Sequence, residues 1–247
     1  SDVCSSDLNS SVKSTYIEDD KQRKQVVIMI KNLVFDLGNV LIEWNSKKIL
    51  TYFEPEKERR QVLRQAIFES GVWHQTDKGE LSLKEACEGV QTQLDASYHS
   101  AVKNIFYHWY EVVHVYSGLQ ERIRLWSDQG YWIYILSTTC EIFYHIEKAG
   151  LLPIYPLLSG YILSSEVGVV KPEAEIYQKL LKKYNLNPVE SVFIDDIQAN
   201  LDTAAELGFE TILSTSETEN ISAMEDLLAV KGNLTEPWLF ASLIVEK

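Results

Sequence analysis

The feature that most constrains the fold is the alternation of short apolar segments with segments of helical periodicity. Apolar side chains dominate residues 28–36, 131–136, 157–163, 192–194 and 211–213. Residues 119–128, 141–149, 172–184 and 199–207, which lie between these segments, repeat apolar side chains at helical spacing. Strands that alternate with helices form a parallel sheet with helices on both faces. The sequence therefore predicts an α/β fold with a doubly wound, Rossmann-like core.

Residues 45–114 interrupt this alternation. They contain a single proline, Pro55, and their apolar side chains recur at helical spacing, as in Val62 and Ala66. We therefore expect a small helical domain at residues 45–114, inserted into a core domain that comprises residues 29–44 and 115–247. Residues 1–28 lack apolar periodicity and precede Met29, the first methionine, so we expect a disordered or non-native tail there.

The charge and composition exclude some classes of partner. The formal net charge of −13 repels nucleic acid and anionic membrane surfaces. A small anionic substrate then needs a local cation, either a metal ion or a lysine. The three cysteines are few and far apart, which suits a reducing compartment. Since no apolar run is long enough to span a membrane, we expect a cytoplasmic protein that acts on a small molecule. No pattern indicates its oligomeric state.

Polar side chains follow the predicted strands at their carboxyl ends. Asp36 closes the first strand, Ser137 closes the second, and the adjacent Asp195 and Asp196 close another. The carboxyl ends of parallel strands share one edge of a sheet, where ligands bind. Carboxylates gathered there repel one another unless a cation pairs with them, and Mg²⁺ is the usual cation beside phosphate. Taken singly, each of these residues is also typical of a turn or a helix cap.

Two further features predict a phosphate site. Ser137 and Thr138 precede a predicted helix, and a hydroxyl group together with free amides at a helix start can bind phosphate. Lys171 precedes Pro172 at the start of another predicted helix, where its positive charge can reach the same anion. Alone, Lys171 is more typical of a surface charge, so the prediction depends on the joint pattern.

These segments resemble the four motifs of the haloacid dehalogenase (HAD) superfamily, in order and with compatible spacing. The segments are Val34-Phe35-Asp36-Leu37-Gly38-Asn39-Val40-Leu41, Ile135-Leu136-Ser137-Thr138, Val170-Lys171-Pro172-Glu173 and Phe193-Ile194-Asp195-Asp196. The joint occurrence is specific, although each piece alone is weak. The resemblance implies a HAD-like core in which the helical insertion is a cap that closes over the site and sets specificity.

The resemblance also implies a role for each matching residue. It implies hydrolysis of a small phosphomonoester through an aspartyl-phosphate, with Mg²⁺ as the cofactor. The implied catalytic residues are Asp36, the nucleophile, and Lys171; the implied metal ligands are Asp36, the Gly38 carbonyl, Asp195 and Asp196; and the implied phosphate ligands are Ser137, Thr138, Lys171 and Asn39.

One position departs from the family's phosphatases, which usually carry a second Asp two residues after the nucleophile as general acid and base. Here that position is Gly38. General acid–base catalysis is commonly worth about 10²–10⁴-fold. A cap residue such as Glu80, or water, must therefore compensate, or the substrate must have a good leaving group. The Asp-Leu-Gly-Asn-Val form resembles a branch that includes bacterial sugar-1-phosphate phosphatases, which implies an anomeric phosphate as the substrate.

Three alternatives remain open. A catalytically weak phosphate-binding or regulatory module would keep the site without turnover, and Gly38 favours that alternative. A 2-haloacid dehalogenase would share the fold and the nucleophile but would not need the pair Asp195 and Asp196. A sugar-phosphate mutase would depend strongly on the acid that Gly38 lacks.

The aromatic residues of the insertion admit two interpretations. Trp73 and the cluster at residues 106–110 are predicted to pack between helices, with a sugar-binding pocket as the alternative. Trp44, soon after the nucleophile, is a candidate contact for the substrate.

Overall fold

The structure of the chain is a computed structural model that describes residues 28–232. The strands are β1 (Asn32–Phe35), β2 (Trp132–Ser137), β3 (Leu158–Leu163), β4 (Ser191–Asp195) and β5 (Glu210–Leu213). The α-helices are α1 (Ser46–Phe53), α2 (Lys57–Arg64), α3 (Val72–Lys78), α4 (Leu83–Gln93), α5 (His99–His108), α6 (Ser117–Asp128), α7 (Ile142–Lys148), α8 (Ser164–Val167), α9 (Ala174–Tyr184), α10 (Gln198–Glu206) and α11 (Glu217–Lys231). Short 3-10 or π turns are η1 (Gln65–Glu69), η2 (Ala96–Tyr98), η3 (Trp109–Val112), η4 (Tyr155–Leu157) and η5 (Pro188–Glu190). The predicted tail, residues 1–28, lies outside the described residues except for residue 28.

The strands form one parallel sheet in the order β3-β2-β1-β4-β5. β1 lies in the middle, where Phe35 pairs with Ile135 of β2 on one side and with Ile194 of β4 on the other. The chain first builds outward from β1 to β3 and then continues on the opposite side with β4 and β5. Such a switch in direction opens a crevice at the carboxyl ends of the central strands. The sheet confirms the predicted Rossmann-like α/β core.

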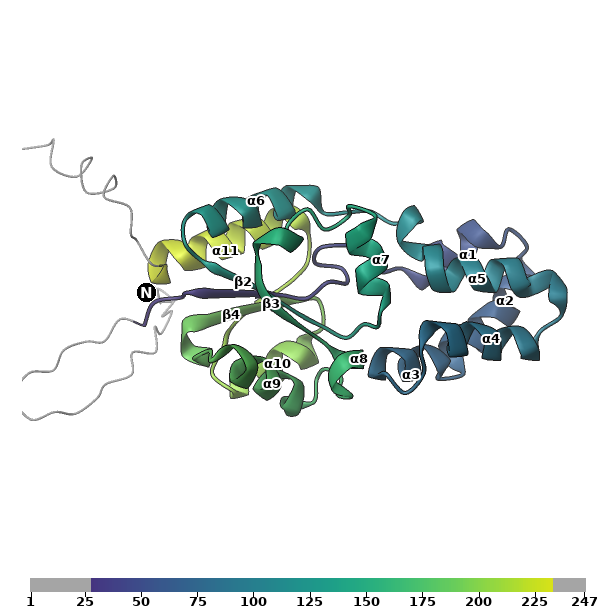
Figure 1. Cartoon of the computed structure of the whole chain (residues 1–247). Helices are drawn as coiled ribbons and strands as arrows, with labels where there is room; N and C mark the ends of the chain where they lie inside the picture. Colours follow the sequence, from purple (N-terminus) through teal and green to yellow (C-terminus); the bar gives the residue numbers. More distant parts are fainter. Residues whose placement is uncertain (1–27, 233–247) are drawn as a thin grey trace, which may run out of the picture.

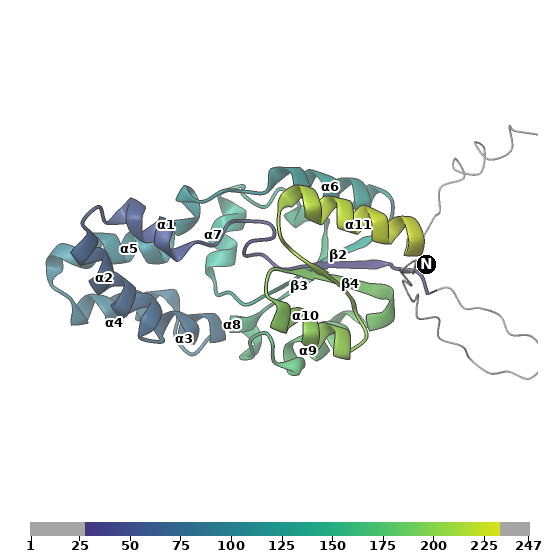
Figure 2. The same cartoon turned by 180° about the vertical axis from the view of Figure 1, so that it is seen from behind.

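Helices cover both faces of the sheet. Leu33 and Phe35 of β1 join the core formed with α6, α7 and α11, whereas Val34 joins the core formed with α9 and α10. Figures 1 and 2 show these helices as two layers on opposite sides of the strands. Strands buried on both faces are apolar throughout. This explains why residues 33–35 are apolar without alternation, while Asn32 at the start of β1 is buried and donates to Ser191.

Helices α1 to α5 form a separate unit beyond one end of the core (Figure 1). The chain enters this unit after Glu43 and leaves it at His114, and the two passages run side by side. The Glu43 N–H donates to the His114 carbonyl at 2.8 Å, and the Tyr116 N–H donates to the Leu41 carbonyl at 3.0 Å. Residues 45–114, the range that the sequence predicts as a separate domain, are called the cap below.

The cap contacts the core where α3 ends. Gly79 follows α3 with a φ of +79°, and a Cβ atom there would overlap the carbonyl oxygen of Ser165 in α8. Both the backbone conformation and the lack of space therefore require glycine. At a second contact, the Leu83 N–H at the start of α4 donates to a Glu141 carboxylate oxygen of the core at 3.0 Å. These contacts hold the cap against the edge of the sheet that carries Asp36.

Some elements differ from the sequence-based expectation. Neither α8 nor α11 was predicted, because α8 has only four residues and the apolar residues of α11 do not gather on one face. The predicted strand at residues 28–36 is shorter, since the Ile30 N–H donates to the Lys231 carbonyl beyond the sheet, at 2.7 Å. Within residues 28–232, no helix combines the length and the apolar character that crossing a membrane requires.

Candidate active site

A buried lysine lies between two buried carboxylates at the carboxyl edge of the sheet. Lys171 Nζ is 2.8 Å from Asp36 Oδ1 and 2.5 Å from Asp195 Oδ2. The side chain of Lys171 is 2% exposed and that of Asp195 is 0% exposed. Charged groups removed from water to this degree are stable only when they are paired. The three side chains therefore form one electrostatic unit.

The strand pairing explains why Asp36 and Asp195 are neighbours. Asp36 directly follows β1, and its N–H donates to the carbonyl of Ile194 in β4 at 3.0 Å. Asp195 ends β4, and its Oδ1 accepts from the Ile197 N–H at 2.8 Å and from the Asn200 side-chain amide at 2.9 Å. With Lys171 on Oδ2, both oxygens of Asp195 are fixed in place.

The turn after β1 holds Asp196. Asn39 Nδ2 donates to Asp196 Oδ2 at 2.9 Å, and Asn39 Oδ1 accepts from the Trp44 N–H at 2.8 Å. Asn39 has a φ of 55°, in the left-handed region that asparagine adopts more readily than most residues. Its side chain contacts the acidic cluster and its own loop, so its role as a phosphate ligand stays a prediction.

The three aspartates are arranged to hold a divalent cation. One oxygen from each of Asp36, Asp195 and Asp196 lies within 4.8 Å of the others. When all are ionised, three negative charges face the single positive charge of Lys171, which leaves an excess that a divalent cation would offset. Mg²⁺ prefers oxygen ligands of this kind. Gly38 lines the same space, and its carbonyl as a fourth ligand stays a prediction.

Burial sets the protonation of the central pair. Burial raises the pKa of Asp36 from 3.8 to about 6, although the adjacent Lys171 pulls it down. Burial by itself would lower the pKa of Lys171, but Asp36 and Asp195 outweigh that effect and raise it above 10.5. Lys171 therefore stays charged, and Asp36 is largely a carboxylate at neutral pH, the form that a nucleophile needs.

The loop after β2 faces this cluster. Ser137 ends β2 and is 2% exposed, and Thr138 Oγ1 accepts from the Lys171 N–H at 3.1 Å. Helix α7 begins only at Ile142, so a loop of residues 138–141 separates Ser137 from the helix. The loop and the first residue of the helix, Ile142, both line the cavity.

A cavity of about 260 Å³ brings the predicted residues together. Its lining includes Asp36, Gly38, Asn39, Ser137, Thr138, Lys171 and Asp196. Asp195, the remaining predicted site residue, lies behind them and is fully buried. The sequence motifs therefore meet at one cavity, as their shared position at the carboxyl edge of the sheet predicts.

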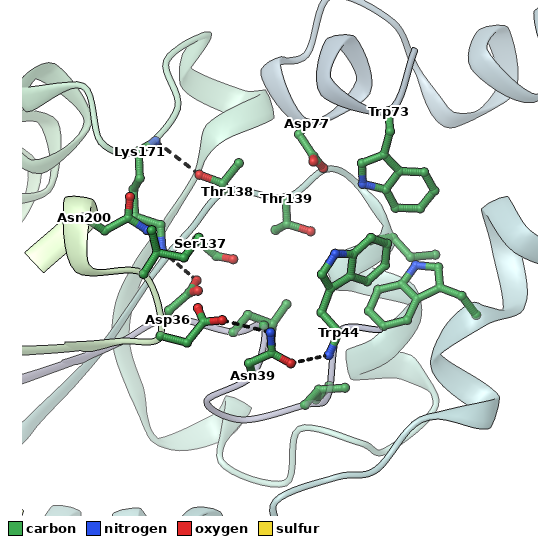
Figure 3. Close-up of a pocket in the computed structure, with 17 residues that line it drawn as sticks. Asp36, Asn39, Trp44, Trp73, Asp77, Ser137, Thr138, Thr139, Lys171 and Asn200 are labelled. Atoms are coloured by element: carbon green, nitrogen blue, oxygen red, sulfur yellow. Dashed lines mark hydrogen bonds and ion pairs between the residues drawn. The ribbon is translucent and has the colours of Figure 1, made fainter. Parts of the chain in front are cut away.

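The opposite wall of the cavity is aromatic. Trp44, Trp73 and Trp109 line it, and Figure 3 shows Trp44 and Trp73 across the cavity from Asp36. The Trp44 ring centroid lies 4.9 Å from that of Trp73 and 4.7 Å from that of Trp109. Phe106 is fully buried and stacks on Trp73. The aromatic residues thus pack between helices and also present an apolar surface to the cavity.

Residues 30–208 match the family of haloacid dehalogenase-like hydrolases. The chain belongs to this family. All four motif segments found in the sequence fall within the matched range.

Individual relatives of this HAD hydrolase are distant. It is 32% identical over 108 residues to enolase-phosphatase E1 of Methylococcus capsulatus, which covers 42% of this chain and 46% of that protein. It is 24% identical over 194 residues to D-ribitol-5-phosphate phosphatase of Bacteroides thetaiotaomicron, which covers 74% of this chain and 91% of that protein. The crystal structure of a HAD family enzyme from B. thetaiotaomicron in complex with magnesium aligns with a TM-score of 0.62 at 25% identity, covering 79% of this chain and 98% of that chain.

The structure of the hydrolase also brings to the cavity residues that the sequence did not single out as site residues, the polar Thr139 and Asp77 among them. Thr139 comes from the loop after β2, and Asp77 comes from α3 of the cap. No sequence signal marks Asp77, because an acidic residue near a helix end is common. Glu80, considered above as a substitute acid, pairs with Lys78 at 3.0 Å and lines a different hollow from Asp36.

Proposed function

We propose that this hydrolase is a Mg²⁺-dependent phosphatase that hydrolyses a small phosphorylated metabolite through an aspartyl-phosphate on Asp36. The cluster of Asp36, Asp195 and Asp196 around Lys171 carries the proposal. A nucleophilic carboxylate, acidic ligands for a divalent cation and a lysine in one cavity are the parts that phosphoryl transfer requires. Two relatives are named as phosphatases, and one structural neighbour was crystallised with magnesium. Both findings support the same function.

The proposed reaction has two steps. First, the Asp36 carboxylate attacks the phosphorus atom, and the bond to the leaving oxygen breaks. The Lys171 ammonium group, 2.8 Å from Asp36 Oδ1, neutralises charge on the transferred phosphoryl group, while Ser137 and Thr138 donate hydrogen bonds to its oxygens. Mg²⁺ held by Asp36, Asp195 and Asp196 would supply positive charge for the same oxygens. Water then attacks the aspartyl-phosphate and releases inorganic phosphate.

The aromatic wall bears on the class of substrate. The faces of Trp44, Trp73 and Trp109 can stack against the apolar face of a sugar ring while the phosphate lies beside Asp36. We propose a sugar 1-phosphate as the substrate class. The anomeric oxygen is a comparatively good leaving group, which suits a site that has Gly38 in the usual place of the acid.

The absence of a carboxylate at residue 38 also favours the second candidate, a phosphate-binding module without turnover. The dehalogenase alternative receives less support, because cleavage of a carbon–halogen bond gives no reason to gather Asp195 and Asp196 beside Asp36. A function that uses a cation accounts for the acidic cluster.

Phosphate release from a panel of sugar 1-phosphates, sugar 6-phosphates, acyl phosphates and nucleotides tests the proposal. We expect release that requires Mg²⁺ and that Asp36→Asn abolishes. Asp202→Asn is the matched control, because Asp202 lies on the exposed face of α10, where it accepts from Gln198. Turnover of simple alkyl phosphates, added to the panel, with none of the sugar 1-phosphates would refute the sugar-1-phosphate class. Binding of Mg²⁺ and beryllium fluoride without any release would establish the binding module instead.

A further inference from the structure

The cavity contains a carboxyl group that the reaction above does not use. Asp36, Asp77 and Asp196 are the carboxyl-bearing residues that line it within the described chain. Asp36 and Asp196 belong to the acidic cluster, whereas Asp77 reaches the cavity from the cap, as Figure 3 shows. A phosphatase with Gly38 in place of the usual acid needs such a group.

Hydrogen bonds fix the backbone of Asp77 beside the loop that follows Ser137. The buried Ser164 hydroxyl donates to the Asp77 backbone carbonyl at 2.5 Å and accepts from the Thr139 N–H at 2.9 Å. One side chain of the core therefore joins the Asp77 peptide to the loop that follows Ser137. The close approach of Gly79 to α8, two residues later, fixes the same end of α3. Asp77 is thus placed by the core, although it belongs to the cap.

The surroundings of Asp77 favour its protonated form. Burial raises its pKa well above the ordinary 3.8, and a hydrogen bond from the Trp73 side chain only partly opposes the rise. The ionisable groups on adjacent elements do not supply a compensating positive charge. Among the cations, Lys171 is paired with Asp36 and Asp195, and Lys78 is paired with Glu80. Burial raises the pKa of the Cys140 thiol to about 12, so it stays neutral, and the acid Glu166 accepts from Tyr144.

We propose that Asp77 is the general acid and base of this hydrolase, supplied by the cap in place of the side chain that Gly38 lacks. When Asp36 attacks phosphorus, the bond between phosphorus and the leaving oxygen breaks, and the Asp77 carboxyl group gives its proton to that oxygen. The Asp77 carboxylate then takes a proton from the water that attacks the aspartyl-phosphate. That attack breaks the bond between phosphorus and Asp36 and restores both carboxyl groups.

This inference rests on the proposed phosphatase activity, and it predicts a dependence on the leaving group. The probes are p-nitrophenyl phosphate, whose leaving group departs as a stable anion, and a sugar 6-phosphate, whose alkoxide needs a proton. In Asp77→Asn, we expect the single-turnover rate with sugar 6-phosphate to fall by about 10²–10⁴-fold. The rate of p-nitrophenol release in the first turnover should change little. Later turnovers should slow because the base is missing, which leaves a burst of one p-nitrophenol per enzyme.

Two further variants separate catalysis from structure. Glu88→Gln is the matched control in the cap, and neither substrate should be affected, since Glu88 lies on the exposed face of α4 and does not line the cavity. Gly38→Asp, introduced into Asp77→Asn, should restore turnover of sugar 6-phosphate. A Cβ atom at Gly38 meets only Trp44 Cβ, at an ordinary 3.5 Å, so the backbone there has room for a Cβ atom.

The outcomes distinguish this inference from the proposed function. Wild-type p-nitrophenyl phosphate turnover that needs Mg²⁺ and Asp36 establishes the phosphatase whatever Asp77 does. Equal losses for both substrates in Asp77→Asn, without a burst, would overturn the inference and assign Asp77 to substrate binding. A wild type that releases p-nitrophenol but hydrolyses none of the sugar 1-phosphates and sugar 6-phosphates of the panel would overturn it as well, because a working acid serves leaving groups that need a proton.

Discussion

Lys171→Met removes the positive charge from between Asp36 and Asp195 while keeping a side chain of similar length. Lys171 is 2% exposed, and its Nζ lies 2.8 Å and 2.5 Å from the two carboxylates. Removing one partner of a buried ion pair commonly costs about 3–5 kcal/mol, because the remaining charge is left uncompensated. Each kcal/mol shifts the melting temperature of a domain this size by roughly 2–4 °C. We therefore expect a loss of roughly 6–20 °C in the absence of metal.

Thermal unfolding followed by circular dichroism, in EDTA and in excess Mg²⁺, measures this loss. Mg²⁺ should reduce it, since a bound cation replaces part of the missing charge. Lys179→Met is the matched control: Lys179 pairs with Glu175 at the surface of α9, where such a pair contributes about 0.3–0.5 kcal/mol. A shift of less than about 2 °C in EDTA, or a shift that Mg²⁺ leaves unchanged, would show that the lysine does not compensate the carboxylates as the structure indicates.

Three other perturbations test separate parts of the structure. Asp195→Asn should raise the Mg²⁺ concentration needed for half-maximal activity by at least about 10-fold, in a metal titration of phosphate release. The pKa of Asp77 is higher in the folded protein than the ordinary 3.8 of the unfolded chain. The protonated side chain therefore contributes its full stability below pH 3.8, and this contribution is lost as the pH rises through the raised pKa. Asp77→Asn should therefore melt at the wild-type temperature near pH 4 and above it at pH 7 to 8; a difference that does not grow with pH would contradict the assignment. Gly79→Ala should lower the urea midpoint more than Gly71→Ala, because both have a positive φ but only Gly79 lacks space for a Cβ atom. Equal midpoints would contradict the close contact with Ser165.

The sequence alone was sufficient to predict the core sheet and the polar residues at the carboxyl ends of its strands. Apolar runs mark β1, β2 and β4, and the polar residue at the end of each run must lie at the carboxyl edge of a parallel sheet. Asp36, Ser137 and Asp195 could therefore be assigned to one site before any distance was known. These inferences are local: strand periodicity and the residue at a strand end are properties of a few consecutive residues.

The contacts of the cap could not be predicted in this way. Glu80 and Asp77 are both acidic and only three residues apart, yet the turn at Gly79 directs Glu80 to Lys78 and leaves Asp77 in the cavity. Likewise, Asn39 matches a motif in sequence, but only the structure shows that its side chain bonds to Asp196.

Local sequence thus determined the strands of the core and which strand ends meet, since hydrogen bonding within a parallel sheet admits few arrangements. Tertiary structure decided which cap residue faces Asp36. That choice depends on the rotation of α3 about its axis and on its approach to α8, which the packing at Ser164 and Gly79 sets through contacts between segments far apart in the chain.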